Sequence, residues 1–258
     1  MALCRSSLFI LFVGVLLLVL RLAYSLPLPI THYQLPMKLL ALDTSTDACS
    51  CALYLDGEIQ DRSVIAPRQH SALILPMADE LLAEADLKPI QLDGLAFGRG
   101  PGSFTGLRIA CGVAQGIAFA ADIPVAPISS LATLAQAAYA ESDAEKVLAA
   151  IDARMSEVYW GPYVLDKQQI MRCECEEIVC APNEVSLPSA GQWYGVGGGW
   201  AIYADKLKAN LGDVVQNYQG EKYPQARAMI PLALTAFAEE QIVSAEEALP
   251  VYLRNKVV

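Results

Sequence analysis

The sequence predicts an α/β protein made of two halves that pack closely against each other. Three observations lead to this fold class. Compact apolar runs of strand length alternate along the chain with stretches of helical periodicity. Each half opens with strands joined by short connections, which favours antiparallel pairing there. No low-complexity linker separates the halves, and 258 residues are enough for two small units with a real core.

The first half, residues 37–145, has the expected order β-β-β-α-β-α-β-α. The Asp56-Gly57 pair is a strong hairpin signal between its second and third strands. The expected strands cover residues 37–43, 49–55, 58–65, 92–98 and 123–129. Apolar residues at helical spacing predict three helices, at 71–85, 107–121 and 129–140. Pro76 should make the first helix begin late or kink, and Ser129 or Ser130 should cap the third.

The second half, residues 146–258, opens with a further set of strand-like runs. These runs are rich in β-branched and aromatic residues and cover 146–153, 156–165 and 169–179. Turn-rich sequence follows as far as Tyr194. Two helices are expected after it, at 200–210 and 225–244, and they are followed by the tail PVYLRN.

Residues 1–36 differ in character from the remainder of the chain. An apolar run of 13 residues, Leu8 to Leu20, lies between Arg5 and Arg21 and is short for a membrane span. With Ala23-Tyr24-Ser25 as a cleavage site, it could be the core of a signal peptide or an anchor. Because ordered-looking sequence begins abruptly at Met37, we favour an upstream extension outside the folded protein, with no membrane contact for residues 37–258.

Composition limits the possible functions. The formal net charge is -10 and the isoelectric point is about 4.7, so the chain alone is a poor binder of nucleic acid. Seven cysteines occur without a CxxC pair, and the two histidines are His32 and His70. This set predicts no metal site and favours reduced thiols in a cytoplasmic protein.

The glycine-rich segment GRGPGSFTGLR, residues 98–108, precedes an apolar helix. It lacks the lysine of a phosphate-binding P-loop, and Thr105 stands where the dinucleotide fingerprint needs a glycine. The glycines still indicate a loop whose backbone approaches another group closely at the start of a helix. Ser103 and Thr105 would cap that helix, and Arg108 would lie in its first turn. We interpret it as a binding surface for an anion or a protein; a plain tight turn is the alternative.

Two further turns could carry chemistry. Asp43-Thr44-Ser45-Thr46 could hold a metal and phosphate oxygens, or could be hairpin chemistry alone. Gly197-Gly198-Gly199 before a helix could admit a flat ligand such as a nucleoside. His70 is expected to cap a helix or lie at the surface. No serine–histidine–aspartate set can be assembled, and no carboxylate pair stands out as an acid–base couple.

Five segments, in order and at fitting spacing, resemble the TsaB (YeaZ) family of bacterial tRNA threonylcarbamoyladenosine biosynthesis proteins. They are MKLLALDTST, QHSALILPMADELL, GRGPGSFTGLRIACGVAQGIA, IDARMSEVYW and PVYLR, and GPGSFTGLR is the most specific. The similarity runs from Met37 to the C-terminus. It implies the fold of the acetate kinase, sugar kinase, Hsp70 and actin superfamily, with two ribonuclease H-like halves around a cleft. In active relatives the DTST and GGG turns face a nucleotide, so Asp43, Thr44, Ser45 and Gly197 to Gly199 would be vestigial nucleotide-binding residues.

The resemblance also implies an accessory role without catalysis. Such a subunit pairs with the transferase TsaD and the ATPase TsaE, downstream of the threonylcarbamoyl-adenylate synthase. The complex transfers threonylcarbamoyl to the adenosine beside the anticodon of tRNAs that read codons starting with A. The chain alone would bind no cofactor, ATP and metal would act through the partners, and tRNA would be reached only through the complex. TsaD carries two metal-binding histidines on a helix, and this chain offers only His70 in the comparable region.

The resemblance places the partner-binding surface at the glycine-rich loop and the two helices of the first half. Small residues four apart, Gly112 and Gly116, would let a partner helix approach closely. The whole expected set is Gly100, Pro101, Gly102, Ser103, Phe104, Thr105, Gly106, Arg108, Gly112, Gly116, Leu73, Leu81 and Leu82. The same surface could form a homodimer when the partner is absent. Two alternatives stay open at this point: a small-molecule kinase of the same superfamily, and a metallopeptidase.

Overall fold

The computed structural model describes residues 37–185 and 189–254, and the predictions for residues 1–36 lie outside this range. It confirms a mixed α/β protein with two β-sheets. The first sheet has five strands in the order β3-β2-β1-β4-β5, and the second has six, with a main path of β11-β10-β6-β7-β8 and β9 paired to β7.

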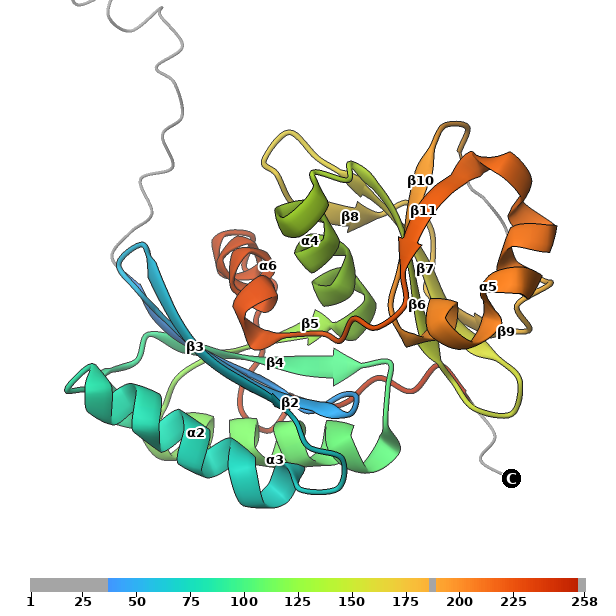
Figure 1. Cartoon of the computed structure of the whole chain (residues 1–258). Coiled ribbons are helices and arrows are strands. Elements are labelled where there is room, and N and C mark those ends of the chain that lie inside the picture. The colour runs from blue at the N-terminus through green and yellow to red at the C-terminus, as the bar shows by residue number, and fades with distance from the viewer. Residues whose placement is uncertain (1–36, 186–188, 255–258) are drawn as a thin grey trace, which may run out of the picture. The chain divides into compact units, whose positions relative to one another are not determined.

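The first sheet begins with a meander and continues with parallel strands. Its strands are β1 (Lys38–Asp43), β2 (Ala48–Leu55), β3 (Glu58–Ile65), β4 (Gly94–Gly100) and β5 (Val125–Ser129). β1 pairs antiparallel with β2 and parallel with β4, in registers that place Leu42 opposite Cys51 and beside Phe97. On one face, α2 (His70–Glu84) and α3 (Phe104–Ala121) cover a core of apolar side chains; α6 (Ala226–Ala238) covers the other face (Figure 1).

The second sheet repeats this plan with shorter strands. Its strands are β6 (Lys146–Asp152), β7 (Val158–Leu165), β8 (Met171–Cys173), β9 (Ile178–Cys180), β10 (Trp193–Val196) and β11 (Val215–Gln219). One face packs against α4 (Ser130–Ser142) through Leu131, Leu134 and Tyr163. The other packs against α5 (Gly198–Leu211), and all three tryptophans of the chain lie in that core.

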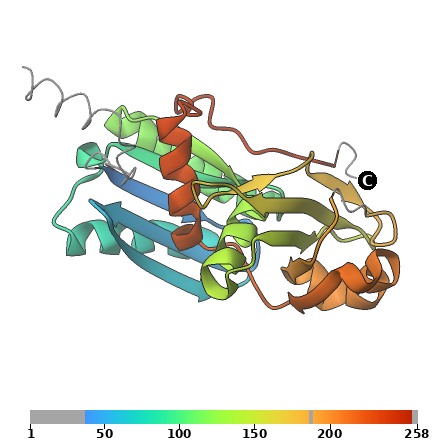
Figure 2. The same cartoon turned by 90° about the horizontal axis from the view of Figure 1, so that it is seen from above.

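Helix packing departs from the order of the chain. α4 precedes the second sheet in sequence and packs on it, whereas α6 follows the second sheet and packs on the first. Figure 2 shows α6 lying across the first sheet. α4 and α6 also contact each other. The helices therefore pack across the expected division at residues 145 and 146: α4 packs on the second sheet and α6 on the first.

Several element boundaries differ from the sequence predictions. α2 begins at His70 and continues through Pro76 without a late start. The expected strand at 169–179 is two short strands, β8 and β9, and the last helix ends at Ala238. β10 and β11 lie in sequence that we expected to be irregular or left unassigned. Ser129 is the cap of α4, because its Oγ accepts hydrogen bonds from the amides of Leu131 and Ala132.

Two one-turn 3₁₀ helices complete the fold, η1 (Pro89–Gln91) and η2 (Gly212–Val214). α3 begins at Phe104, three residues before the expected start, and Ser103 caps it by accepting from the Gly106 amide at 3.3 Å. Thr105 lies inside the helix and is not the cap. By length and composition α3 could cross a membrane, but its apolar side packs on the first sheet, as in a core helix of a folded domain.

Candidate functional site

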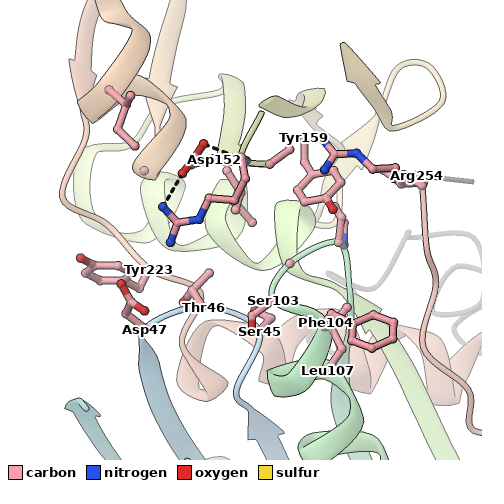
Figure 3. Close-up of a pocket in the computed structure, with 18 of the residues that line it drawn as sticks. Ser45, Thr46, Asp47, Ser103, Phe104, Leu107, Asp152, Tyr159, Tyr223 and Arg254 are labelled. Carbon is pink, nitrogen blue, oxygen red and sulfur yellow. Dashed lines mark hydrogen bonds and ion pairs between the residues drawn. The ribbon is translucent and has the colours of Figure 1, made fainter. Parts of the chain in front are cut away.

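A cleft of about 670 Å³ lies where turns of both halves meet. The first half supplies the β1–β2 turn and the loop before α3, and the second half supplies the β6–β7 turn and the start of α5. The C-terminal tail closes one side with Val251, Tyr252, Leu253 and Arg254. Figure 3 shows hydroxyl and carboxylate side chains from the first half facing Asp152 and Tyr159 of the second.

The glycine-rich loop is held tightly against the β1–β2 turn. The Ser103 amide donates to the Ser45 carbonyl at 2.7 Å, and the Thr44 hydroxyl donates to the Gly106 carbonyl at 2.7 Å. A Cβ on Gly102 or Gly106 would overlap the backbone carbonyl oxygens of this turn. The density of glycines therefore follows from close packing inside the molecule.

This packing corrects part of the predicted docking surface. Gly100, Pro101 and Gly106 are buried, and Gly100 has a left-handed backbone with φ +109°. Gly102 is half-buried. The exposed members of the predicted loop surface are Ser103, Phe104, Thr105 and Arg108. The Arg108 guanidinium lies 3.8 Å from the centre of the Phe104 ring, and its Nε donates to the Tyr252 hydroxyl at 3.2 Å.

Asp43 ends β1 and is completely buried beneath the cleft. Its Oδ1 accepts from the amide and the hydroxyl of Ser45, at 2.9 and 2.8 Å, and its Oδ2 has no partner within residues 37–185 and 189–254. Burial raises the pKa of the carboxyl to about 6, and the two bonds from Ser45 only partly offset that effect. Because Asp43 and Thr44 do not line the cleft, they offer it no metal or phosphate ligand; of the DTST turn, Ser45 and Thr46 do line it.

The three glycines before α5 have different roles. Gly197 has φ +104°, and a Cβ on it would overlap the Ala150 carbonyl of β6. A Cβ on Gly199 would lie 2.8 Å from that of Ala150, so Gly199 also serves the packing of α5 on β6. Gly198 has open space and lines the cleft, and is the one member of the three in a position to meet a ligand.

Each described cation that lines the cleft is paired with a carboxylate, whereas the lining carboxylates Asp47 and Glu221 form no ion pair with a described residue. Asp152 bonds with Arg154, from guanidinium to carboxylate at 3.1 Å, and also accepts from the Tyr203 hydroxyl at 3.3 Å. Arg254 pairs with Glu157, and Lys222 pairs with Glu141 at 2.6 Å. The described lining contains neither histidine nor cysteine, so no serine–histidine or cysteine–histidine pair faces this cleft.

Sequence reasoning missed Asp152, Arg154, Tyr223 and Arg254 as cleft residues. Asp152 and Arg154 lie in the segment IDARMSEVYW and Arg254 lies in PVYLR, which we used only as family markers. A carboxylate at the end of β6, matching Asp43 at the end of β1, was the available signal for Asp152. His70 was expected to cap a helix or lie at the surface, and this is wrong: it is the first residue of α2 and is buried, and Gln69 is the N-cap. Its Nε2 atom is unpartnered among the described residues, and it does not line the cleft.

A second candidate surface is the side of α2 and α3 that faces away from the sheet, which we call the α2–α3 face. Gly112, Gly116 and Phe119 of α3 are exposed, as is Leu75 of α2, and Phe119 is 71% exposed. Nothing lies within 4 Å of a Cβ built on Gly112 or Gly116. No described side chain therefore covers the backbone of α3 at Gly112 and Gly116.

The predicted leucines of this surface need correction. Leu81 is 0% and Leu82 is 3% exposed, because both point into the core between α2, α3 and the sheet. Leu73 is partly buried and packs against the same core. A helix that covers a sheet must bury one stripe of apolar residues, and the sequence alone did not say which leucines belong to it.

Fold and site together define the class of protein: a mixed α/β molecule of the ribonuclease H-like, actin-type fold, with a cleft between the turns of its two halves. Residues 63–254 match the family described as TsaD, tRNA N6-adenosine threonylcarbamoyltransferase. Two similar curated proteins are each named tRNA threonylcarbamoyladenosine biosynthesis protein TsaB. The Escherichia coli protein is 44% identical over 86% of this chain and 96% of its own length, and the Haemophilus influenzae protein is 45% identical over 86% and 95%.

A solved structure agrees with these matches. YeaZ from Pseudomonas aeruginosa is 46% identical, has a TM-score of 0.80, and is covered over its whole length by 84% of this chain. The chain belongs to the TsaB (YeaZ) family.

Proposed function

We propose that this chain is a non-catalytic subunit in the formation of threonylcarbamoyladenosine in tRNA. It binds and activates a TsaD-type transferase through the α2–α3 face, and the ATPase TsaE joins the complex. The names of its relatives support the pathway, since proteins 44% and 45% identical to it are called tRNA threonylcarbamoyladenosine biosynthesis proteins. The match to the TsaD family supports a partner of related fold.

The observation that carries the proposal is the pair of open glycines on α3. A glycine inside a helix destabilises it by about 0.5–1 kcal/mol relative to alanine. Gly106, in the first turn of the same helix, has an internal reason, because it packs against the β1–β2 turn. Gly112 and Gly116 have none, because the space above them is empty. Docking of a partner helix would explain these glycines. Two glycines four residues apart lie on the same face of α3, and without side chains there the backbone of another helix can approach closely.

The remainder of the face suits a protein partner. Phe119 and Leu75 supply exposed apolar area near the glycines, and Phe104 with Arg108 extends the surface toward the cleft. Exposed aromatic and arginine side chains are enriched at interfaces. A face of this kind can also meet a second copy of itself, so we propose a homodimer when the transferase is absent.

The proposed lack of catalysis rests on the cleft. Its cations are paired with carboxylates of the same chain, and Asp43 lies beneath its surface. ATP and a metal would accordingly act through the partner subunits, and the acidic charge of the chain leaves tRNA contacts to the complex. This role places the protein in the cytoplasm.

Substitution at the open glycines tests the docking proposal. Gly112→Leu or Gly116→Leu should abolish co-purification with the TsaD-type partner, because the added side chain keeps the helices apart. Reconstituted tRNA modification should fall with it, by at least about tenfold, since each 1.4 kcal/mol of lost affinity is a factor of ten. Folding should be intact by circular dichroism, as both positions are open.

Ala209→Leu is the matched control, because it places the same leucine side chain at an exposed position of α5 in the other half. It should leave co-purification and modification unchanged. Full partner binding by both glycine variants would contradict the docking surface. Modification of tRNA by the chain alone would contradict the accessory role.

A further inference from the structure

A second cavity, of about 300 Å³, lies on the side of the first sheet opposite α2 and α3. It is bordered by the end of β5, by β8 and by α6, and thus receives side chains from both halves. It shares no residue with the cleft described above. The function proposed for the chain makes no use of it.

Arg99 lies at the wall of this cavity, and no residue in the described part of the chain serves as its counterion. Its Nε is buried and has no hydrogen-bond partner, and among the described residues the guanidinium forms no ion pair. The β4–β5 register shifts between Gly98 and Gly100, so Arg99 is the extra residue of a bulge. A bulge redirects a side chain out of the regular alternation of a strand, and it does so here for an arginine.

A carboxylate lines the same cavity. Oε1 of Glu177 accepts hydrogen bonds from the hydroxyls of Ser129 and Tyr163, and Glu177 forms no ion pair with any described residue. Ser129 also accepts from two amides as the cap of α4, so its own proton is directed at Glu177. The start of α4 favours a negative charge at this position.

The Tyr163 hydroxyl keeps its proton and donates a hydrogen bond to Glu177. The phenol is 1% exposed, and burial together with the nearby carboxylate raises its pKa well above 10. The phenol therefore remains a hydrogen-bond donor to Glu177 at neutral pH. Three charged groups line this cavity. Arg172 is paired with Asp166 and Glu239, whereas Arg99 and Glu177 have no ion-pair partner in the described part of the chain.

Unpaired charges in partly buried positions are costly, and a ligand that supplies both counter-charges removes that cost. From this juxtaposition we propose that the cavity binds a small zwitterionic amino acid. Its carboxylate meets Arg99 and its ammonium group meets Glu177. The apolar part of the wall, including Ile128, Ile170 and Leu232, receives its side chain. Because Arg99 belongs to the first half and Glu177 to the second, the ligand would link the two.

Titration calorimetry with the full chain and defined probes tests this site. L-valine and γ-aminobutyrate sample a short and a long separation of the two charges. N-acetyl-L-valine lacks the cation and L-valinamide lacks the anion. At least one of the two zwitterions should bind at millimolar concentration or below and raise the melting temperature, and neither blocked analogue should do so.

Arg99→Gln and Glu177→Gln should each weaken binding of that zwitterion by about tenfold or more, as expected for loss of one charge-assisted bond. Arg99→Gln removes no side-chain hydrogen bond or ion pair within the described chain, so it should fold normally. The matched controls are Arg68→Gln and Glu176→Gln, both of which alter exposed residues and should bind as the unmodified chain does.

The proposal is overturned if no zwitterion binds, if a blocked analogue binds equally well, or if the two cavity variants bind normally. Its outcome is independent of the docking proposal, because Arg99→Gln should still co-purify with the transferase.

Discussion

Asp43 carries the clearest consequence of burial for a single residue. In sequence it was an even choice between a ligand-holding carboxylate and ordinary turn chemistry. In the structure it accepts two bonds from Ser45, helps to fix the β1–β2 turn, and leaves one oxygen without a partner. A Cβ on Gly98 would overlap that oxygen, so the neighbouring strand is pressed against the carboxyl group.

Asp43→Asn should stabilise the protein at neutral pH. The carboxyl has a pKa of about 6 in the folded chain and a usual value of 3.8. Between these values the unfolded chain is ionised and the folded chain holds its proton, so stability falls as the pH rises through this window. Above a pH of about 6, the ionised Asp43 lowers the free energy of unfolding by a constant amount of about 3 kcal/mol.

Thermal unfolding at pH 4 and pH 8 checks this expectation. The variant should melt well above the unmodified protein at pH 8 and nearly with it at pH 4. Asp79→Asn, at an exposed carboxylate of α2, is the control. A stabilisation equal at both pH values, or a loss at pH 8, would contradict the ionisation argument.

At the scale of the element, α3 combines two kinds of glycine. Gly106, in its first turn, is required because the backbone of the β1–β2 turn lies against it, and Gly112 and Gly116 in its middle have open space. The helix thus uses one glycine for internal packing and two on the face proposed for docking. The sequence showed the spacing of these residues, and the difference between them came from what lies beside each.

Alanine substitutions along α3 should separate these roles. At dilutions where the proposed homodimer is dissociated, Gly112→Ala and Gly116→Ala should each stabilise the chain by about 0.5–1 kcal/mol, because alanine favours the helix and meets no neighbour. Gly106→Ala should destabilise it, since its methyl group would overlap the Thr44 carbonyl. Urea unfolding of the three variants provides the measurement. Destabilisation by the first two would mean that the α2–α3 face is already covered in the isolated chain.

At the scale of the whole molecule, the two halves are joined by exchanged packing. α6 follows the second sheet in the chain and completes the core of the first, with Met229, Ile230 and Ala233 buried there. The tail that follows returns to the first half, where the Val251 amide donates to the Arg99 carbonyl at 2.8 Å. Arg254 then pairs with Glu157 of the second half. Neither half keeps its full set of contacts without the other.

Met229→Ala should therefore lower the stability of both halves together. The loss expected for a fully buried methionine is about 2–5 kcal/mol. All three tryptophans lie in the core of the second half, so their fluorescence reports on the half that does not contain the mutation site. The urea midpoint measured by tryptophan fluorescence should shift as far as the midpoint measured by far-ultraviolet circular dichroism. A tryptophan transition that stays in place would show that the halves unfold independently.

The sequence was sufficient for features that depend on neighbouring residues. Alternation and apolar runs placed the long strands β1, β2, β6 and β7, and the Asp56-Gly57 turn fixed the first hairpin. It was insufficient for β10 and β11, which are short strands stabilised by parallel pairing with distant partners. Pro76 was compatible with a continuing helix because the packing of α2 on the sheet outweighs one missing hydrogen bond.

By its own patterns the sequence determined the fold class, the glycine-rich loop, the small residues of α3 and the absence of a recognisable catalytic set. Only the tertiary structure decided that Asp43 lies beneath the cleft, that Leu81 and Leu82 face the core, and that Arg99 and Glu177 share a cavity. The physical reason is the sequence distance over which each interaction acts. Periodicity and turn chemistry act over a few residues, whereas burial and charge pairing depend on which distant segments the fold brings together.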